Sequence, residues 1–190
     1  MKFTCVVLSI VFALALSGPA QAAEHEDPPS NGLGAGIGTY MSILAVREGC
    51  NYGFPQSVLV WEQAYSALMR DKAAALTTLE RVWGNTFGQV YPLAEMRTEV
   101  QAAIWANYRE HLNERQLSWV CLAPEQFLSS FGKLLEPLVF QVQRWERAGE
   151  YDRLARDMRR DLAMMSKEQK QALRASLRTS LVNGVSPGGQ

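Results

Sequence analysis

Histidine is scarce in this 190-residue sequence, with His25 and His111 as its two copies. Nucleophilic catalysis by serine or cysteine needs a positioned base, and that base is usually a histidine. His25 belongs to a polar stretch and His111 borders an apolar stripe, where a histidine is typically structural. Neither an H-E-x-x-H motif nor a pair of cysteines at zinc-binding spacing occurs. We therefore expect neither an enzyme nor a cofactor, and keep an enzyme with an unrecognised site as an alternative.

Long apolar runs are absent after the first 22 residues, so no later segment predicts a membrane span. Before that point, Lys2 is followed by a run from Val6 to Leu16 that is apolar at all but one position. This run is too short to cross a bilayer, and it leads to the small-residue triplet Ala20-Gln21-Ala22. We predict that residues 1–22 are a signal peptide cleaved after Ala22, and that the mature chain is soluble and periplasmic or secreted.

Cysteine is almost as rare, with three copies in the chain. Cys5 lies inside the predicted signal peptide, which leaves Cys50 and Cys121 in the mature protein. Because an oxidising compartment favours disulfides, we predict that these two are bonded. The alternative is a pair of buried free thiols.

The 19 Lys and Arg residues balance the 19 Asp and Glu residues, so the chain has no net charge. Proteins that bind nucleic acid are typically basic, so this balance disfavours nucleic acid as a partner. The charges are unevenly placed. Residues 23–143 hold 8 basic and 13 acidic side chains, a balance of −5, whereas residues 144–190 hold 10 basic and 6 acidic, a balance of +4.

The basic last part of the chain predicts either a docking surface for an acidic protein or a solvated face with interleaved charges. The candidate partner-binding residues are its ten basic side chains: Arg144, Arg147, Arg153, Arg156, Arg159, Arg160, Lys167, Lys170, Arg174 and Arg178.

A metal site is predicted at the mature N-terminus. Cleavage after Ala22 would leave Ala23-Glu24-His25 as the first three residues. The terminal amine, two amide nitrogens and the His25 imidazole would then form the square-planar nitrogen set that Cu(II) and Ni(II) favour.

The start and the end of the mature chain lack a helical pattern. Residues 23–38 combine an acidic stretch with glycine at positions 32, 34, 36 and 38, which predicts a flexible arm. The alternative is that two overlapping G-x-x-x-G pairs allow another helix to approach closely. Residues 184–190 are expected to be a disordered tail.

Helical periodicity dominates the region between these ends, residues 39–183. The clearest helix is expected from Pro92 to Cys121, where Met96, Val100, Ile104 and other apolar residues recur at intervals of four. Other helices are expected from Thr39 to about Gly49, from Pro55 to about Gly84, and from Pro124 onward, with a kink or break before Pro137. A fifth carries Leu154, Met158 and Leu162, and a sixth begins at Ser166 with a capping box to Gln169.

No run of alternating β-branched residues occurs, so strands are not expected. The prediction is an all-α antiparallel bundle of about five to six helices with one disulfide, in which residues 149–183 form a basic helical arm.

Two short segments resemble a known helix-start motif. Met165-Ser166-Lys167-Glu168-Gln169 and Leu122-Ala123-Pro124-Glu125-Gln126 are similar to the L-T-x-x-Q helix starts of the small periplasmic stress chaperones related to Spy and CpxP. The resemblance implies an all-helical protein that binds unfolded clients in a cradle. Ordinary helix caps explain the same residues.

Three features favour a protein that binds another protein in the bacterial periplasm. They are the absence of a catalytic set of residues, the small scaffold held by a disulfide, and the division of charge between an acidic first part and a basic last part of the chain. An immunity or inhibitor protein for an enzyme active in the envelope is one instance. The alternatives are a stress chaperone of the Spy and CpxP type, an enzyme with an unrecognised site, and a structural role in an envelope machine.

Overall fold

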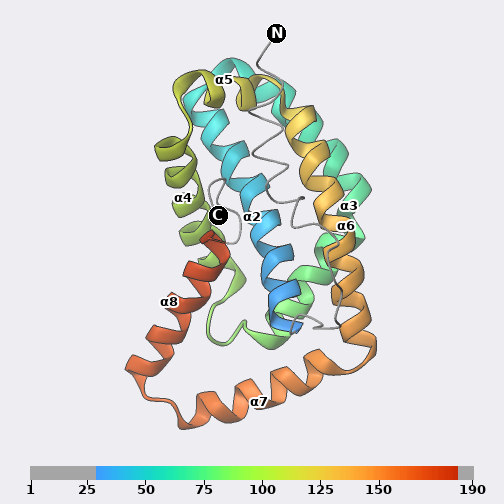
Figure 1. Ribbon diagram of the computed structural model, residues 1–190, viewed down its shortest axis with the longest axis vertical. Helices are drawn as coiled ribbons and strands as arrows, with labels where there is room; N and C mark the ends of the chain where they lie inside the picture. The colour runs from blue at the N-terminus through green and yellow to red at the C-terminus, as the bar shows by residue number, and fades with distance from the viewer. Residues whose placement is uncertain (1–28, 184–190) are drawn as a thin grey trace, which may run out of the picture.

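The computed structural model describes residues 29–183, in which helices account for nearly all of the chain and no strand occurs (Figure 1). The seven α-helices confirm the all-α class and slightly exceed the expected number. The predicted signal peptide, His25 and the tail 184–190 lie outside the described residues. The elements are α2 (Pro29–Gly53), the 3-10 helix η1 (Pro55–Ser57), α3 (Val58–Thr86), α4 (Leu93–His111), α5 (Glu114–Leu122), α6 (Pro124–Arg147), α7 (Glu150–Met164) and α8 (Lys167–Asn183).

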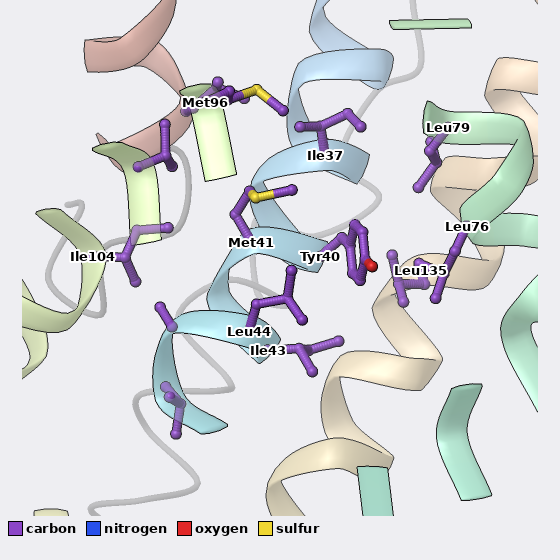
Figure 2. Close-up of a cluster of buried hydrophobic side chains, with 14 of the residues drawn as sticks. Ile37, Tyr40, Met41, Ile43, Leu44, Leu76, Leu79, Met96, Ile104 and Leu135 are labelled. Carbon is purple, nitrogen blue, oxygen red and sulfur yellow. The ribbon is translucent and has the colours of Figure 1, made fainter. Parts of the chain in front are cut away.

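Helix α2 is the centre of the fold, because α3, α4, α6 and α8 all pack around it. Residues 29–46 carry no charge, and the side chains of Leu33, Ile37 and Met41 are fully buried. Figure 2 shows α2 side chains directed toward Met96 and Ile104 on one side and toward other helices on the opposite side. An apolar helix of this kind is stable in water only when other helices cover it.

The helices around α2 run in both directions. Gly36 of α2 faces Leu79 of α3, while Arg47 further along α2 pairs with Glu62, so α3 is antiparallel to α2. Met41 contacts Gln101 and Gly49 faces Trp105, so α4 is parallel to α2. Helix α7 crosses one end of the bundle and α5 lies at the other (Figure 1).

The predicted flexible arm 23–38 is wrong over residues 29–38, which are the first part of α2. A glycine costs a helix up to about 1 kcal/mol relative to alanine, but here burial of Leu33 and Ile37 offsets that cost. Gly36 also allows α3 to approach, since a Cβ atom on it would lie 2.8 Å from Leu79 Cδ2. The two glycines of this G-x-x-x-G pair face different helices, however, because Gly32 lies against Gln141 of α6.

The predicted single helix from Pro92 to Cys121 is two helices, α4 and α5, separated at Leu112 and Asn113. Asn113 begins α5 with a capping box, in which its Oδ1 accepts a hydrogen bond from the Gln116 N–H at 3.0 Å. Gln116 Oε1 in turn accepts one from the Asn113 N–H at 2.9 Å. These bonds satisfy backbone N–H groups at the start of α5 that have no partner within the helix. They therefore stabilise the turn between α4 and α5.

Helix α6 continues through Pro137 as one helix, so of the predicted kink or break, the break is wrong. The proline removes one backbone hydrogen bond, but α6 packs along both α2 and α3 and buries Leu135 and Val139 on either side of it. The predicted start at Ser166 is confirmed, because its N–H donates to Gln169 Oε1 at 2.8 Å.

The predicted disulfide is confirmed: Cys50 and Cys121 are bonded, with a Cα–Cα distance of 5.2 Å. Both cysteines are fully buried, and the bond ties the last turn of α2 to α5 across 71 residues of sequence. It fits a protein that folds outside the reducing cytoplasm. Within residues 29–183, no helix combines the length and apolar character that a membrane span requires.

Replacing both Cys50 and Cys121 with alanine should lower the free energy of unfolding by about 4 kcal/mol, because the denatured chain loses its crosslink. Urea denaturation of the protein without residues 1–22 and of its variant measures the difference. The same protein, unreduced and unfolded, should also show no reactive thiol. Two reactive thiols, or equal unfolding midpoints, would contradict the stabilising disulfide.

Two glycines of α2 should respond oppositely to alanine. A Cβ atom at Gly49 would lie 2.1 Å from Trp105 Cδ2, so Gly49→Ala should destabilise the protein by about 1–3 kcal/mol. Gly34 has open space around its Cβ position, so Gly34→Ala should stabilise the helix by about 0.5–1 kcal/mol. Chemical denaturation of both variants tests this, and a change of the same sign in both would refute the packing described.

Candidate functional site

The end of the molecule that carries the disulfide exposes large apolar side chains. Tyr52 is 91% exposed, and Leu59 and Leu122 are 68% and 54% exposed. Tyr52 and Leu122 each lie within two residues of a bonded cysteine, so the disulfide holds them at one end of the bundle. Leu59 is in the first turn of α3, shortly after α2 ends. We call this group the disulfide-end surface, and it consists of Tyr52, Leu59, Val60, Trp119 and Leu122.

The disulfide-end surface is exposed because its members lie off the buried sides of their helices. In α5, Val120 and Cys121 face the core, and their neighbours Trp119 and Leu122 therefore face outward. Tryptophan and tyrosine are enriched where proteins bind proteins. Two more large apolar side chains are exposed in the described part of the chain, Phe140 in α6 and Met164 at the end of α7.

A groove with a volume of about 590 Å³ lies between α2 and α4 and includes Tyr52, so it adjoins the disulfide-end surface. Ala45 and Ala102 contribute small side chains to its lining, and the Trp105 ring packs directly against Gly49. Its larger and polar lining residues are Glu48, Tyr52, Arg97, Thr98, Gln101 and Trp105.

The floor of this groove holds a buried amide with unused hydrogen-bonding capacity. The Gln101 side chain is 7% exposed, and its one hydrogen bond is a weak contact from Nε2 to Met41 Sδ at 3.9 Å. A buried amide normally pairs its carbonyl oxygen as well. Glu48 is exposed beside it and forms no ion pair with any described residue.

A second cluster joins α2 to α3 just behind this groove. Arg47 forms a bidentate pair with Glu62, at 2.8 and 2.6 Å, and its guanidinium lies 4.4 Å from the centre of the Tyr65 ring. Asn51 Nδ2 also donates to Glu62 Oε1 at 2.9 Å. The hydrogen bonds from Arg47 and Asn51 hold the pKa of the Glu62 carboxyl below its usual value.

A third cluster fixes α8 on the bundle. The Arg174 guanidinium lies 4.8 Å from the centre of the Tyr91 ring. It pairs with Glu95 at 2.5 Å and also with Glu99, while the Tyr91 hydroxyl donates to Glu99 at 3.0 Å. Arg174, predicted from the sequence to bind a partner, is therefore engaged within the protein.

The other predicted partner-binding residues do not form one patch, because they are spread over α6, α7 and α8. Arg153 pairs with Glu150, and Arg160 lies near Asp157 and Asp161. Within the described chain, five of the ten are exposed and form neither an ion pair nor a side-chain hydrogen bond: Arg156, Arg159, Lys167, Lys170 and Arg178. Arg147 is also exposed, but its Nε donates to the Gln143 carbonyl oxygen at 3.3 Å.

Helix α7 is electrically balanced. Its four arginines are matched by Glu150, Asp152, Asp157 and Asp161, and such interleaving is typical of a solvated face. The basic excess of the arm therefore lies in α8, which has four basic residues and one acidic residue, Glu168.

A smaller groove of about 310 Å³ lies between α3 and α6. Lys72 and Glu136 form an ion pair at 2.5 Å in its lining, and the exposed Phe140 borders it. Its charged groups are paired, so it offers less unused polar capacity than the α2/α4 groove.

The pKa shifts of the described residues give little support for acid–base catalysis. Burial raises the pKa of the Tyr40, Tyr91 and Tyr108 hydroxyls, and that of Tyr151 to about 12. These hydroxyls thus stay protonated at neutral pH. Over residues 29–183 no group of three or more His, Cys, Asp or Glu side chains is placed to hold a metal ion.

Comparison with known proteins found no matching family model, no similar curated protein and no similar solved structure. The function of the chain is therefore inferred from its own residues. The geometry offers an exposed apolar end and an adjoining polar groove, both suited to binding.

Sequence reasoning missed both features. The Trp119 and Leu122 pair flanks Val120 and Cys121, and a nine-residue helix leaves one side of such a run exposed. The exposed side of this segment could be inferred once α5 was known to be a separate short helix. No sequence pattern indicated the groove, because Glu48 and Trp105 belong to different helices and are brought together only by the packing of α4 on α2.

The Arg47–Glu62 pair should make stability depend on pH. Because the folded pKa of Glu62 is depressed, its stabilisation is present above the unfolded pKa and is lost as pH falls through the folded pKa. Glu62→Gln should therefore flatten the decline in unfolding free energy between about pH 5 and 3. Urea denaturation across this range, with Glu110→Gln as the control, tests it. An unchanged slope in Glu62→Gln would rule out the pair as the cause.

Proposed function

We propose that this protein is exported to the bacterial periplasm by its signal peptide and acts by binding another protein through the disulfide-end surface. An immunity or inhibitor protein that blocks an envelope-active enzyme is the instance we favour. Binding, rather than catalysis, is the activity that the described residues suit best.

The observation that carries this proposal is the gathering of exposed apolar side chains at one end. Five of the seven large apolar side chains that are exposed within residues 29–183 belong to the disulfide-end surface. Clustered exposed apolar groups mark interaction sites, whereas scattered ones do not.

The disulfide supports the proposal because it fixes the segments that carry this surface. Tyr52 follows Cys50 on α2, and Trp119 and Leu122 flank Cys121 on α5. A preformed surface loses less conformational entropy on binding, so its contacts contribute more to affinity.

The exposed cations of α7 and α8 form a second contact candidate for an acidic partner. They include Arg156, Lys167 and Arg178. Charge pairs at the rim of an interface mainly raise the rate of association. Deleting the arm would not test them, because α8 buries Leu181 against the core, so charge substitution is the appropriate change.

A chaperone of the Spy and CpxP type is the second candidate, favoured by the same exposed apolar end. A chaperone would bind many unfolded clients rather than one partner. Binding of an apolar dye by the folded protein, together with suppression of client aggregation, would favour it.

Removing apolar area from the disulfide-end surface should abolish capture of the partner. The variant Tyr52→Ser, Leu59→Ser, Leu122→Ser alters its most exposed members, and we expect affinity to fall at least about a hundredfold. Crosslinking capture of a single stoichiometric protein from the envelope fraction measures this, with thermal unfolding checked in parallel.

The matched control is Phe140→Ser, Met164→Ser, which removes side chains that are 63% and 73% exposed elsewhere. It should capture the partner like the unchanged protein. Equal capture by both variants would refute the disulfide-end surface as the interface, and a smear of many captured proteins would favour the chaperone.

A further inference from the structure

Two arginines of this protein occupy the same kind of site. Arg47 lies over Tyr65 and pairs with Glu62, and Arg174 lies over Tyr91 and pairs with Glu95 and Glu99. In each case a planar guanidinium stacks on an aromatic ring while carboxylates bind its N–H groups. This arrangement combines cation–π attraction with charge-assisted hydrogen bonds.

The α2/α4 groove has the components of a third such site. Trp105 supplies an aromatic ring and Glu48 an exposed carboxylate, and both line the groove. Gln101, a residue that is 7% exposed, adds a side-chain carbonyl oxygen that accepts no hydrogen bond within the described chain. The missing component is the cation.

The nearby cations are committed to other acids. Arg97 lines the groove but pairs with Glu80 of α3. Arg47, next to Glu48 in sequence, pairs with Glu62. Glu48 therefore has no ion-pair partner within residues 29–183, and the groove has room for one supplied from outside.

We infer that the α2/α4 groove receives an arginine side chain of the partner protein, stacked on Trp105, paired with Glu48 and donating to Gln101 Oε1. This inference rests on the proposed function, since the groove adjoins the disulfide-end surface through Tyr52. The volume of about 590 Å³ also accommodates the residues flanking that arginine.

Arginine suits these groups better than lysine. Its planar guanidinium has several N–H donors in one plane, so one face can stack on Trp105 while its edge reaches both Glu48 and Gln101. A lysine ammonium is a compact point charge and cannot stack in this way. Loss of the positive charge should remove the attraction to Glu48.

The test uses a capped tripeptide, acetyl-Ala-Arg-Ala-amide, added to the mature ¹⁵N-labelled protein. We expect saturable NMR shifts at the Trp105 indole N–H and the Gln101 amide, with a Kd of about 1–10 mM. The same peptide with citrulline in place of arginine keeps the shape but loses the charge, and should bind at least about fivefold more weakly.

Two variants complete the experiment. Glu48→Gln is an exposed, conservative change that should weaken binding of the arginine peptide about tenfold, whereas Glu110→Gln should leave it unchanged. Absence of saturable shifts by about 50 mM peptide, equal binding of the citrulline peptide, or no effect of Glu48→Gln would each overturn the inference. These outcomes involve no partner protein, so they are distinct from failure of capture by the disulfide-end surface.

Discussion

Burial of residues 29–46 of helix α2, which carry no charge, is the constraint on which the rest of the structure depends. Most of these residues are buried, so this part of α2 needs cover on several sides. Helices α3, α4, α6 and α8 supply that cover, and each does so with one apolar side while the other stays polar. The hydrophobic effect thus determines the architecture, and ion pairs such as Arg47–Glu62 and Arg174–Glu95 set the register of the covering helices.

The two candidate binding features, the disulfide-end surface and the α2/α4 groove, follow from this arrangement. Helix α5 is too short to bury both of its sides, and the disulfide anchors it where α2 ends. The groove lies where α4 packs on α2, with the Trp105 ring against Gly49 and the short side chains of Ala45 and Ala102 beside it. Both features of the proposed function therefore lie where the cover of α2 is incomplete, toward the same end of the bundle.

Local signals in the sequence predicted local structure well. The stripe of Met96, Val100 and Ile104 is buried as its spacing indicates, and the cap at Ser166 forms. The disulfide followed from counting cysteines. The glycine-rich start of α2 could not be predicted, because its stability comes from burial by distant residues. The groove was equally unpredictable, since the spacing between Glu48 and Trp105 in the sequence says nothing of their proximity.

The central position of α2 also sets a demand on biosynthesis. Gly32 faces Gln141, since a Cβ atom on it would lie 2.8 Å from Gln141 Oε1, and Gln141 is 141 − 32 = 109 residues later in the chain. A chain that crosses a membrane from its N-terminus delivers α2 first and its cover from α6 and α8 last. Under the proposed export, the most apolar helix of the protein would stay uncovered until α6 and α8 arrive, while long-range contacts are slow to form and exposed apolar surface is prone to aggregation. The proposed export would thus be coupled to folding through a single helix.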